Sequence, residues 1–115
     1  MDDSLKLSKI IYNLILEKKP LDIELIDIQP VSTLSDYLII TTSGSNTQTK
    51  AIIAHIMKSL KESKIKPSNI EGYTGLNWVL MDYSNIVVHI FSKEATQYYQ
   101  FHRLWEDCNK ITFQK

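Results

Sequence analysis

Residues 78–91 constrain the fold more than any other segment, because they read as an antiparallel hairpin. Two apolar stretches, Trp78–Tyr83 and Ile86–Phe91, are separated by only two residues, Ser84 and Asn85. In such a hairpin the residues that flank the turn oppose each other, and successive side chains point to opposite faces. One face is wholly apolar. We expect that face to be buried beneath helices.

The opposite face of this hairpin mixes aromatic side chains with a carboxylate and an imidazole. Its expected cross-strand pairs are Trp78–Phe91, Leu80–His89 and Asp82–Val87. Aromatic residues beside a few charges are typical of the centres of protein interfaces. We therefore predict that this second face is a recognition surface.

The remaining pattern predicts one α/β domain over residues 1–115, a mixed β-sheet packed with helices. Apolar periodicity indicates helices over residues 4–18, 47–63 and 93–108. In the second helix the expected buried stripe is Ile53, Ile56, Met57 and Leu60. Strands are expected over residues 21–28, where a change in alternation points to a bulge, over 36–42, and as a short piece within 69–73. Ser92 is expected to cap the last helix.

Composition narrows the classes of partner. Lys plus Arg and Asp plus Glu are balanced at 13 each, so no global basic field favours nucleic acid, and no sequence-specific nucleic-acid partner is predicted. The single Cys108 excludes an intrachain disulfide. No apolar stretch approaches the ~20 residues of a membrane span. The acidic start, Met-Asp-Asp-Ser, differs from a basic targeting peptide, so we expect a cytoplasmic protein.

The turn Ser43-Gly44-Ser45, at a strand end and a helix start, is able in principle to hold an anion. It lacks the lysine of a phosphate-binding P-loop. Ser45 followed by Gln48 is also the pattern of an ordinary helix cap, and this interpretation is favoured.

Metal and catalytic chemistry are poorly supported by the sequence. The candidate carboxylates are Asp22, Asp27, Asp36 and Asp82, with no Asp-x-Asp pair among them, and Asp22 and Asp27 should point to opposite faces of a strand. The histidines, His55, His89 and His102, lack the spacing of a zinc site. We predict no metal, no cofactor and no catalytic residue.

The last helix carries an aromatic stripe. Helical spacing places Tyr98, Phe101 and Trp105 on one seam, which favours a core role over a base-stacking platform. Tyr99 lies off that seam and is expected to be exposed.

Taken together, these segments resemble the Iojap family of ribosomal silencing factors. The resemblance is carried in order by Asp36–Ser45, Gln48, Ala51, Glu71-Gly72, Trp78–Tyr83, Val87–Phe91, Glu94, Tyr99 and Leu104-Trp105. It implies a nucleotidyltransferase-like topology without the enzymatic activity. It also implies binding to the large ribosomal subunit through the fourteenth large-subunit ribosomal protein, a steric block to small-subunit joining when nutrients are scarce, and homodimers off the ribosome.

By position, the resemblance implies that the face of Trp78, Leu80 and Asp82 meets the ribosomal protein. The neighbouring candidates for this contact are His89, Glu94 and Tyr99. On this reading Trp78→Ala should abolish silencing and leave the fold intact.

Two other interpretations stay open. The first is a nucleotidyltransferase-like enzyme that uses Ser43–Asn46 for phosphate and Asp36 or Asp82 for a metal. The second is a self-associating interaction module with a non-ribosomal partner.

Overall fold

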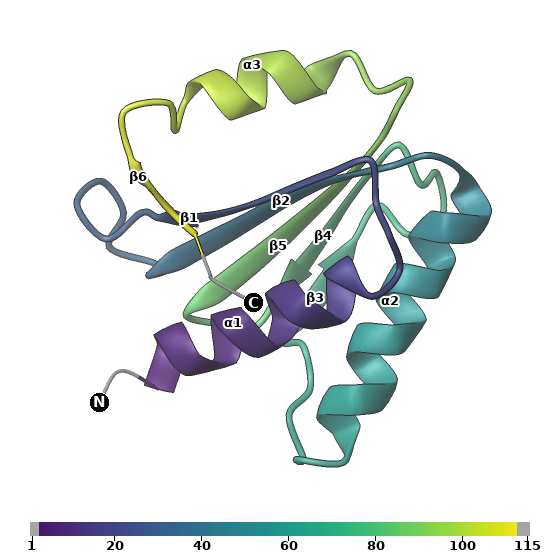
Figure 1. Cartoon of the computed structure of the whole chain (residues 1–115), viewed down its shortest axis with the longest axis horizontal. Coiled ribbons are helices and arrows are strands. Elements are labelled where there is room, and N and C mark those ends of the chain that lie inside the picture. The colour runs from purple at the N-terminus through teal and green to yellow at the C-terminus, as the bar shows by residue number, and fades with distance from the viewer. Residues whose placement is uncertain (1–2, 113–115) are drawn as a thin grey trace.

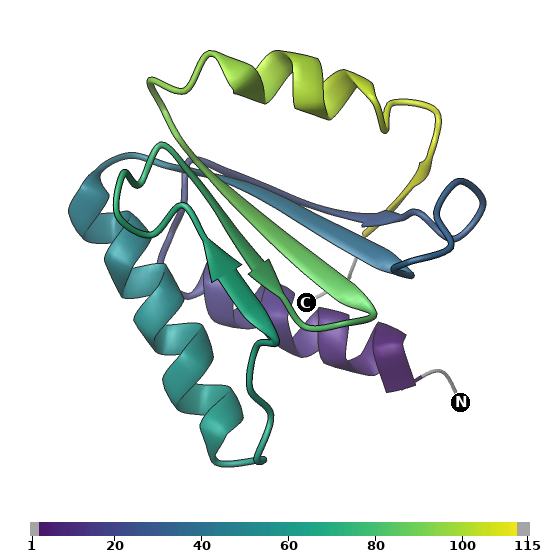
Figure 2. The same ribbon diagram turned by 180° about the vertical axis from the view of Figure 1, so that it is seen from behind.

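A six-stranded sheet separates two layers of helices in the computed structural model, which describes residues 3–112 (Figure 1). The helices α1 (Asp3–Leu16) and α2 (Asn46–Lys61) cover one face, and α3 (Gln97–Arg103) lies over the other (Figures 1 and 2). The strands are β1 (Asp22–Asp27), β2 (Tyr37–Ser43), β3 (Asn69–Glu71), β4 (Trp78–Asp82), β5 (Ile86–Ser92) and β6 (Asn109–Ile111). Their order is β3-β4-β5-β2-β1-β6, in which β2 and β5 are parallel and the other neighbours antiparallel. The prediction of an α/β domain with a mixed sheet is confirmed.

The central strand β2 is buried on both faces. Ile39 belongs to the core beneath α1 and α2, whereas Leu38 and Ile40 belong to a second core beneath α3. An almost continuous apolar run is what a strand covered on both sides requires.

The hairpin of β4 and β5 has the predicted register. Cross-strand partners run from Trp78 opposite Phe91 to Asp82 opposite Val87. The amide of Tyr83 donates to the carbonyl of Ile86 at 2.8 Å and closes the two-residue turn. On the first face the four side chains between these ends are fully buried: Val79, Met81, Val88 and Ile90.

Strand β1 contains no bulge, contrary to the prediction. Its six residues pair with consecutive residues of β2. The change in alternation arises because both faces of β1 are covered: Leu25 packs in the core of α1 and α2, and Ile26 in the core of α3. Asp22 and Asp27 point to opposite faces as expected.

The last helix is shorter than predicted, and its cap is different. Ser92 belongs to β5, and its hydroxyl donates to Oδ1 of Asn77 at 3.2 Å instead of capping a helix. The helix begins at Gln97 and ends at Arg103, so Cys108 lies beyond it. The chain then forms β6 on β1, a strand that sequence analysis missed.

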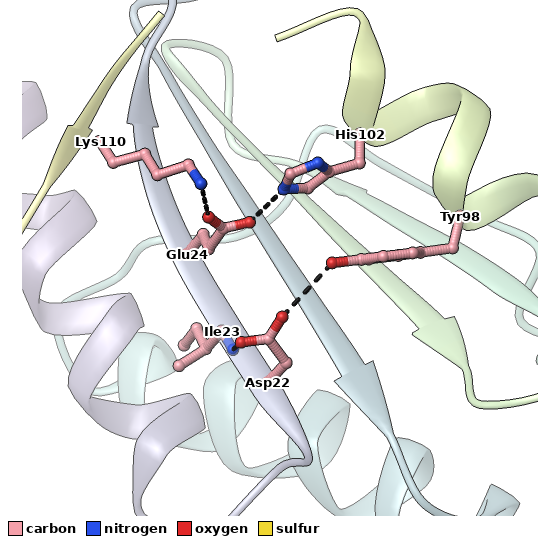
Figure 3. A network of polar contacts seen from close by, with 6 residues as sticks. All are labelled: Asp22, Ile23, Glu24, Tyr98, His102 and Lys110. Carbon is pink, nitrogen blue, oxygen red and sulfur yellow. Dashed lines mark hydrogen bonds and ion pairs between the residues drawn. The ribbon is translucent and has the colours of Figure 1, made fainter. Parts of the chain in front are cut away.

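A carboxylate on β1 ties α3 and β6 to the sheet (Figure 3). Glu24 contacts Nε2 of His102 on α3 and Nζ of Lys110 on β6. Burial alone would raise the pKa of Glu24, but the hydrogen bonds from Lys110 and His102 outweigh it and lower the pKa. One helical turn before His102 on α3, the hydroxyl of Tyr98 donates to the carboxylate of Asp22 at 3.3 Å.

Aromatic packing attaches α3 to the hairpin. The ring of Phe101 lies 5.3 Å from that of Trp78, 4.3 Å from that of His89 and 5.6 Å from that of Phe91. The indole Nε1 of Trp78 donates to Nδ1 of His89 at 2.9 Å, so the imidazole is an acceptor there. Burial lowers the pKa of His89 to about 4, which keeps it neutral at pH 7.

None of the helices within residues 3–112 is long and apolar enough to cross a membrane.

Replacing the carboxylate of Glu24 should loosen both elements that it holds. We expect Glu24→Gln to lower the free energy of unfolding at neutral pH by about 1.5–3 kcal/mol, the usual range for hydrogen bonds to a charged group. Because the folded-state pKa of Glu24 is lowered, this contribution is present above the unfolded-state pKa and is lost on acidification, so variant and wild type should converge at low pH. Denaturant melts at several pH values measure the difference.

Glu17→Gln is the matched control for this experiment. Glu17 also pairs with a histidine, His55, but its side chain is 61% exposed, and exposed pairs contribute little. Equal losses in the two variants would contradict a special role for Glu24.

Acidification should also destabilise the fold through His89. Its folded-state pKa lies below the unfolded value, so the unfolded chain takes up the proton first and stability falls as pH drops from about 6.5 towards 4. At pH 5 the loss should be about 2 kcal/mol relative to pH 7. His89→Asn keeps an acceptor for Trp78 without a titrating group, and should flatten the slope between these pH values in denaturant melts. An unchanged slope would show that His89 does not cause it.

Candidate protein-interaction face

The candidate site is the row of side chains Trp78, Leu80 and Asp82 on β4, together with Glu71 opposite Leu80 on β3. We call this set the β4 face. It lies on the same side of the sheet as α3, and its three β4 side chains are half-buried while Glu71 is exposed. Three of the residues that the sequence assigned to a recognition surface therefore do lie together.

Trp78 is the fixed centre of this face. Its ring stacks on that of Phe91 at 4.9 Å, and its indole nitrogen is held by His89. Two open hollows adjoin it. One, of about 390 Å³, is lined by Glu71, Gly72, Trp78 and Leu80. The other, of about 330 Å³, is lined by Trp78, Gln97, Gln100, Phe101 and Leu104.

Gly72 sets the backbone position of this tryptophan. Its φ is +80°, and a Cβ added there would lie 2.0 Å from the carbonyl oxygen of Trp78. Only glycine permits so close an approach of β3 to the start of β4.

The charges of the β4 face are acidic, and both adjoin Leu80. Asp82 accepts a hydrogen bond from the amide of Ser84 at 2.8 Å, so it also organises the hairpin turn, where Ser84 has a φ of +69°. Glu71 accepts from the side-chain amide of Asn69 at 2.7 Å. Leu80 has Glu71 directly opposite it on β3 and Asp82 two residues along β4, and an apolar side chain beside two carboxylates suits a partner that presents basic and apolar groups.

The other predicted contact residues do not join this face. His89 is only 6% exposed, because α3 and Trp78 cover it, so it supports the face from below and cannot present its ring to a partner. Tyr99 is 77% exposed as expected, but it borders a different hollow, with Asp22 and Lys93. Glu94 is exposed in the turn before α3, not within the helix.

Sequence analysis missed the part of the site that α3 and the residue after it, Leu104, supply. Leu104, which was expected to lie along the helix, is 70% exposed and lines the second hollow. Gln97, Gln100 and Leu104 have the spacing of one helical face, three and four residues apart, and this was the available signal.

The turn Ser43-Gly44-Ser45 is a capped helix start. The amide of Gly44 donates to Oε1 of Gln48 at 2.7 Å, and the amide of Ser45 faces the hydroxyl of Ser43 at 3.3 Å. The hydroxyl of Ser45 accepts from the amide of Gln48 at 3.1 Å. These side chains occupy the amides that an anion would need.

The residues that the enzyme interpretation requires lie far apart in the structure. Asp36 and Asp82 lie near the hairpin turn, since the amide of Asp36 donates to the carbonyl of Asn85 at 2.8 Å. The Ser43 turn is at the other end of β2, roughly 20 Å away for a strand of this length. Within the part of the chain that the structure describes, no three acidic, histidine or cysteine side chains form a group able to hold a metal.

Comparison with known proteins gives a consistent result. The family described as "Ribosomal silencing factor during starvation" (RsfS) matches residues 1–115. The ribosomal silencing factor RsfS of Bacillus subtilis is 34% identical over 92 residues, 80% of this chain and 78% of that protein. A mouse protein named "Mitochondrial assembly of ribosomal large subunit protein 1" is 24% identical over 83% of this chain and 43% of its own length.

Solved structures agree with the fold. A crystal structure from Bacillus halodurans matches with a TM-score of 0.84 at 28% identity, over 95% of this chain and 99% of that one. One from Chromobacterium violaceum matches with a TM-score of 0.83 at 29% identity, over 100% and 94%. The chain belongs to the RsfS family of ribosomal silencing factors, regulatory proteins that act on translation at the ribosome.

Proposed function

We propose that this chain binds the large ribosomal subunit through its fourteenth ribosomal protein, using the β4 face, and thereby blocks joining of the small subunit when nutrients are scarce. Family membership supports a ribosomal site of action. The name of the mouse relative refers to the large subunit. The observation that carries the choice of face is the apolar pair Trp78 and Leu80 with the carboxylates of Glu71 and Asp82 next to Leu80, since ribosomal proteins offer basic and apolar surface.

This mechanism requires a bound chain that is bulky enough and tightly enough held to exclude the small subunit, and it requires no catalysed reaction. The body measures 36 × 34 × 29 Å, and the small subunit cannot enter the volume that it occupies when bound. A standard interface would cover roughly 800 Å² of it. A nucleotidyltransferase-like activity has no comparable support, because its phosphate turn and its carboxylates lie at opposite ends of β2.

Trp78→Ala is a poorer test of this proposal than the sequence indicated. Trp78 packs on Phe91 and Phe101 and is hydrogen-bonded to His89, so its removal should loosen α3 as well as the face. Loss of binding in this variant would not separate a contact role from a structural one.

Leu80→Lys is the sharper variant. Leu80 is half-buried, and a lysine stem can follow the same surface with its ammonium in water. Against a basic partner we expect at least a 30-fold weaker affinity for isolated large subunits, equivalent to about 2 kcal/mol. Co-sedimentation followed by addition of small subunits measures binding and the block to joining together.

Leu34→Lys is its control, since Leu34 is 88% exposed in the connection between β1 and β2. It should bind and block joining as the wild type does. If Leu80→Lys keeps its fold by thermal melting and also binds as the wild type does, the β4 face is not the contact surface.

Asp82→Asn separates charge from structure. An asparagine oxygen can still accept from the amide of Ser84, so the turn should persist while the negative charge is lost. We expect a severalfold slower association at low salt and little difference at high salt, because rim charges act mainly on encounter. Stopped-flow association at two salt concentrations measures this. Equal salt dependence in variant and wild type would remove Asp82 from the proposal.

We further propose that the free chain is cytoplasmic and forms homodimers away from the ribosome, as the family resemblance implies. Sedimentation velocity of the purified protein, with and without large subunits, tests the dimer.

A further inference from the structure

An apolar groove with a basic rim lies on the opposite side of the sheet from the β4 face. Its first hollow, of about 560 Å³, is lined by Met57, Lys58, Lys61, Ile65, Lys66 and Pro67. A second, of about 410 Å³, shares Met57 and adds Ile53, Ala54, Ile70 and Tyr73. We call the two together the α2–β3 groove. Figure 2 shows α2 running beside β3. The residues that line the two hollows come from α2, from β3 and from the segments on either side of β3.

The floor of the groove is apolar surface left open to solvent. Met57, predicted from periodicity to be buried, is 40% exposed, and Tyr73 is 50% exposed. Methionine adapts its shape readily and is common on surfaces that bind peptide segments. Exposed apolar side chains gathered in a concave site mark a place for a partner.

The rim is formed by lysines. Lys58 and Lys61 belong to α2, and Lys66 to the segment that leads to β3. Among residues 3–112 none of these three forms an ion pair. Unpaired cations around an apolar floor are complementary to an amphipathic segment with carboxylates along its edges.

We propose that the α2–β3 groove binds an acidic amphipathic segment of a partner protein. The apolar side chains of that segment would cover Met57 and Ile70, and its carboxylates would meet the three lysines. A nucleic acid would use the lysines but leave the apolar floor uncovered. A second copy of this chain, docked groove to groove, would bring the two lysine rims together, which like-charge repulsion disfavours.

This surface can be occupied while the β4 face is in use. Ile70 points into the core beside α2, whereas its neighbour Glu71 faces Leu80 on the other side of the sheet. The inference does not depend on the proposed ribosomal contact, and its test is independent of ribosome binding.

The test is photo-crosslinking in cells with p-benzoyl-phenylalanine in place of Met57. We expect an adduct with one protein, identified by mass spectrometry, whose crosslinked segment is acidic and amphipathic. Substitution at Leu34, which is 88% exposed in the connection between β1 and β2, gives the background.

Charge reversal distinguishes an effect of the rim lysines from an effect of net charge. Combining the crosslinker with Lys58→Glu, Lys61→Glu and Lys66→Glu should lower the adduct yield at least fivefold. The control, Lys6→Glu, Lys18→Glu and Lys93→Glu, changes net charge equally at exposed sites that do not line the groove and should leave the yield within twofold. Thermal melting must show both triple variants folded, and single reversals replace the rim triple if it is not.

Four results would overturn the proposal. They are an adduct with RNA, an adduct with a second copy of this chain, no adduct above the Leu34 background, and a yield that does not respond to the rim lysines. Loss of large-subunit binding in Leu80→Lys with an intact Met57 adduct would leave both proposals standing as separate surfaces.

Discussion

Burial of β2 and β5 on both faces is the constraint on which this structure depends. The two parallel strands lie at the centre of the sheet, and side chains of β2 point alternately into two different cores. Neither core closes without helices on its own side, so α1 and α2 must cover one face and α3 the other. The short α3 cannot cover the whole face, and the half-exposed side chains of β4 are what remains. The candidate site thus exists because α3 covers less of its face of the sheet than α1 and α2 cover of theirs.

The sequence correctly predicted the elements in which the apolar residues of one face all pack into a single core. The hairpin of β4 and β5 was placed with its register, because its first face meets one apolar core and a two-residue turn leaves little freedom. Strand β1 was misread as bulged because Leu25 and Ile26 enter different cores, and alternation rules assume a single one. The start of α3 was misplaced because Ser92 looks like a cap in sequence, whereas in space it reaches Asn77. Strand β6 has three residues and depends on pairing with β1, so no local pattern could reveal it.

The candidate site was predicted in part for the same reason. Alternation alone put Trp78, Leu80 and Asp82 on one face. It could not show that α3 packs against His89 and Phe91. Because of this packing, one half of that face is buried and Trp78 lies at the boundary between the buried and the exposed half. Glu71, on β3, and Leu104, just after α3, lie outside the hairpin, and their place beside Trp78 follows from tertiary packing. Met57 was predicted to be buried, but it is exposed. A stripe of apolar residues shows which side of a helix faces the core, but not how much of that side the core covers.

The position of the tryptophans has a consequence for spectroscopy. The chain has two, Trp78 and Trp105, and both pack with the core beneath α3, while the larger core beneath α1 and α2 has neither. Intrinsic indole emission therefore reports on one layer of the molecule. Detachment of α3, or arrival of a partner over Trp78, would change the signal, whereas loosening of α1 would be nearly silent. A fluorescence melt and a circular dichroism melt of this protein observe different parts of the fold, and their coincidence would measure how tightly the two layers are coupled across the sheet.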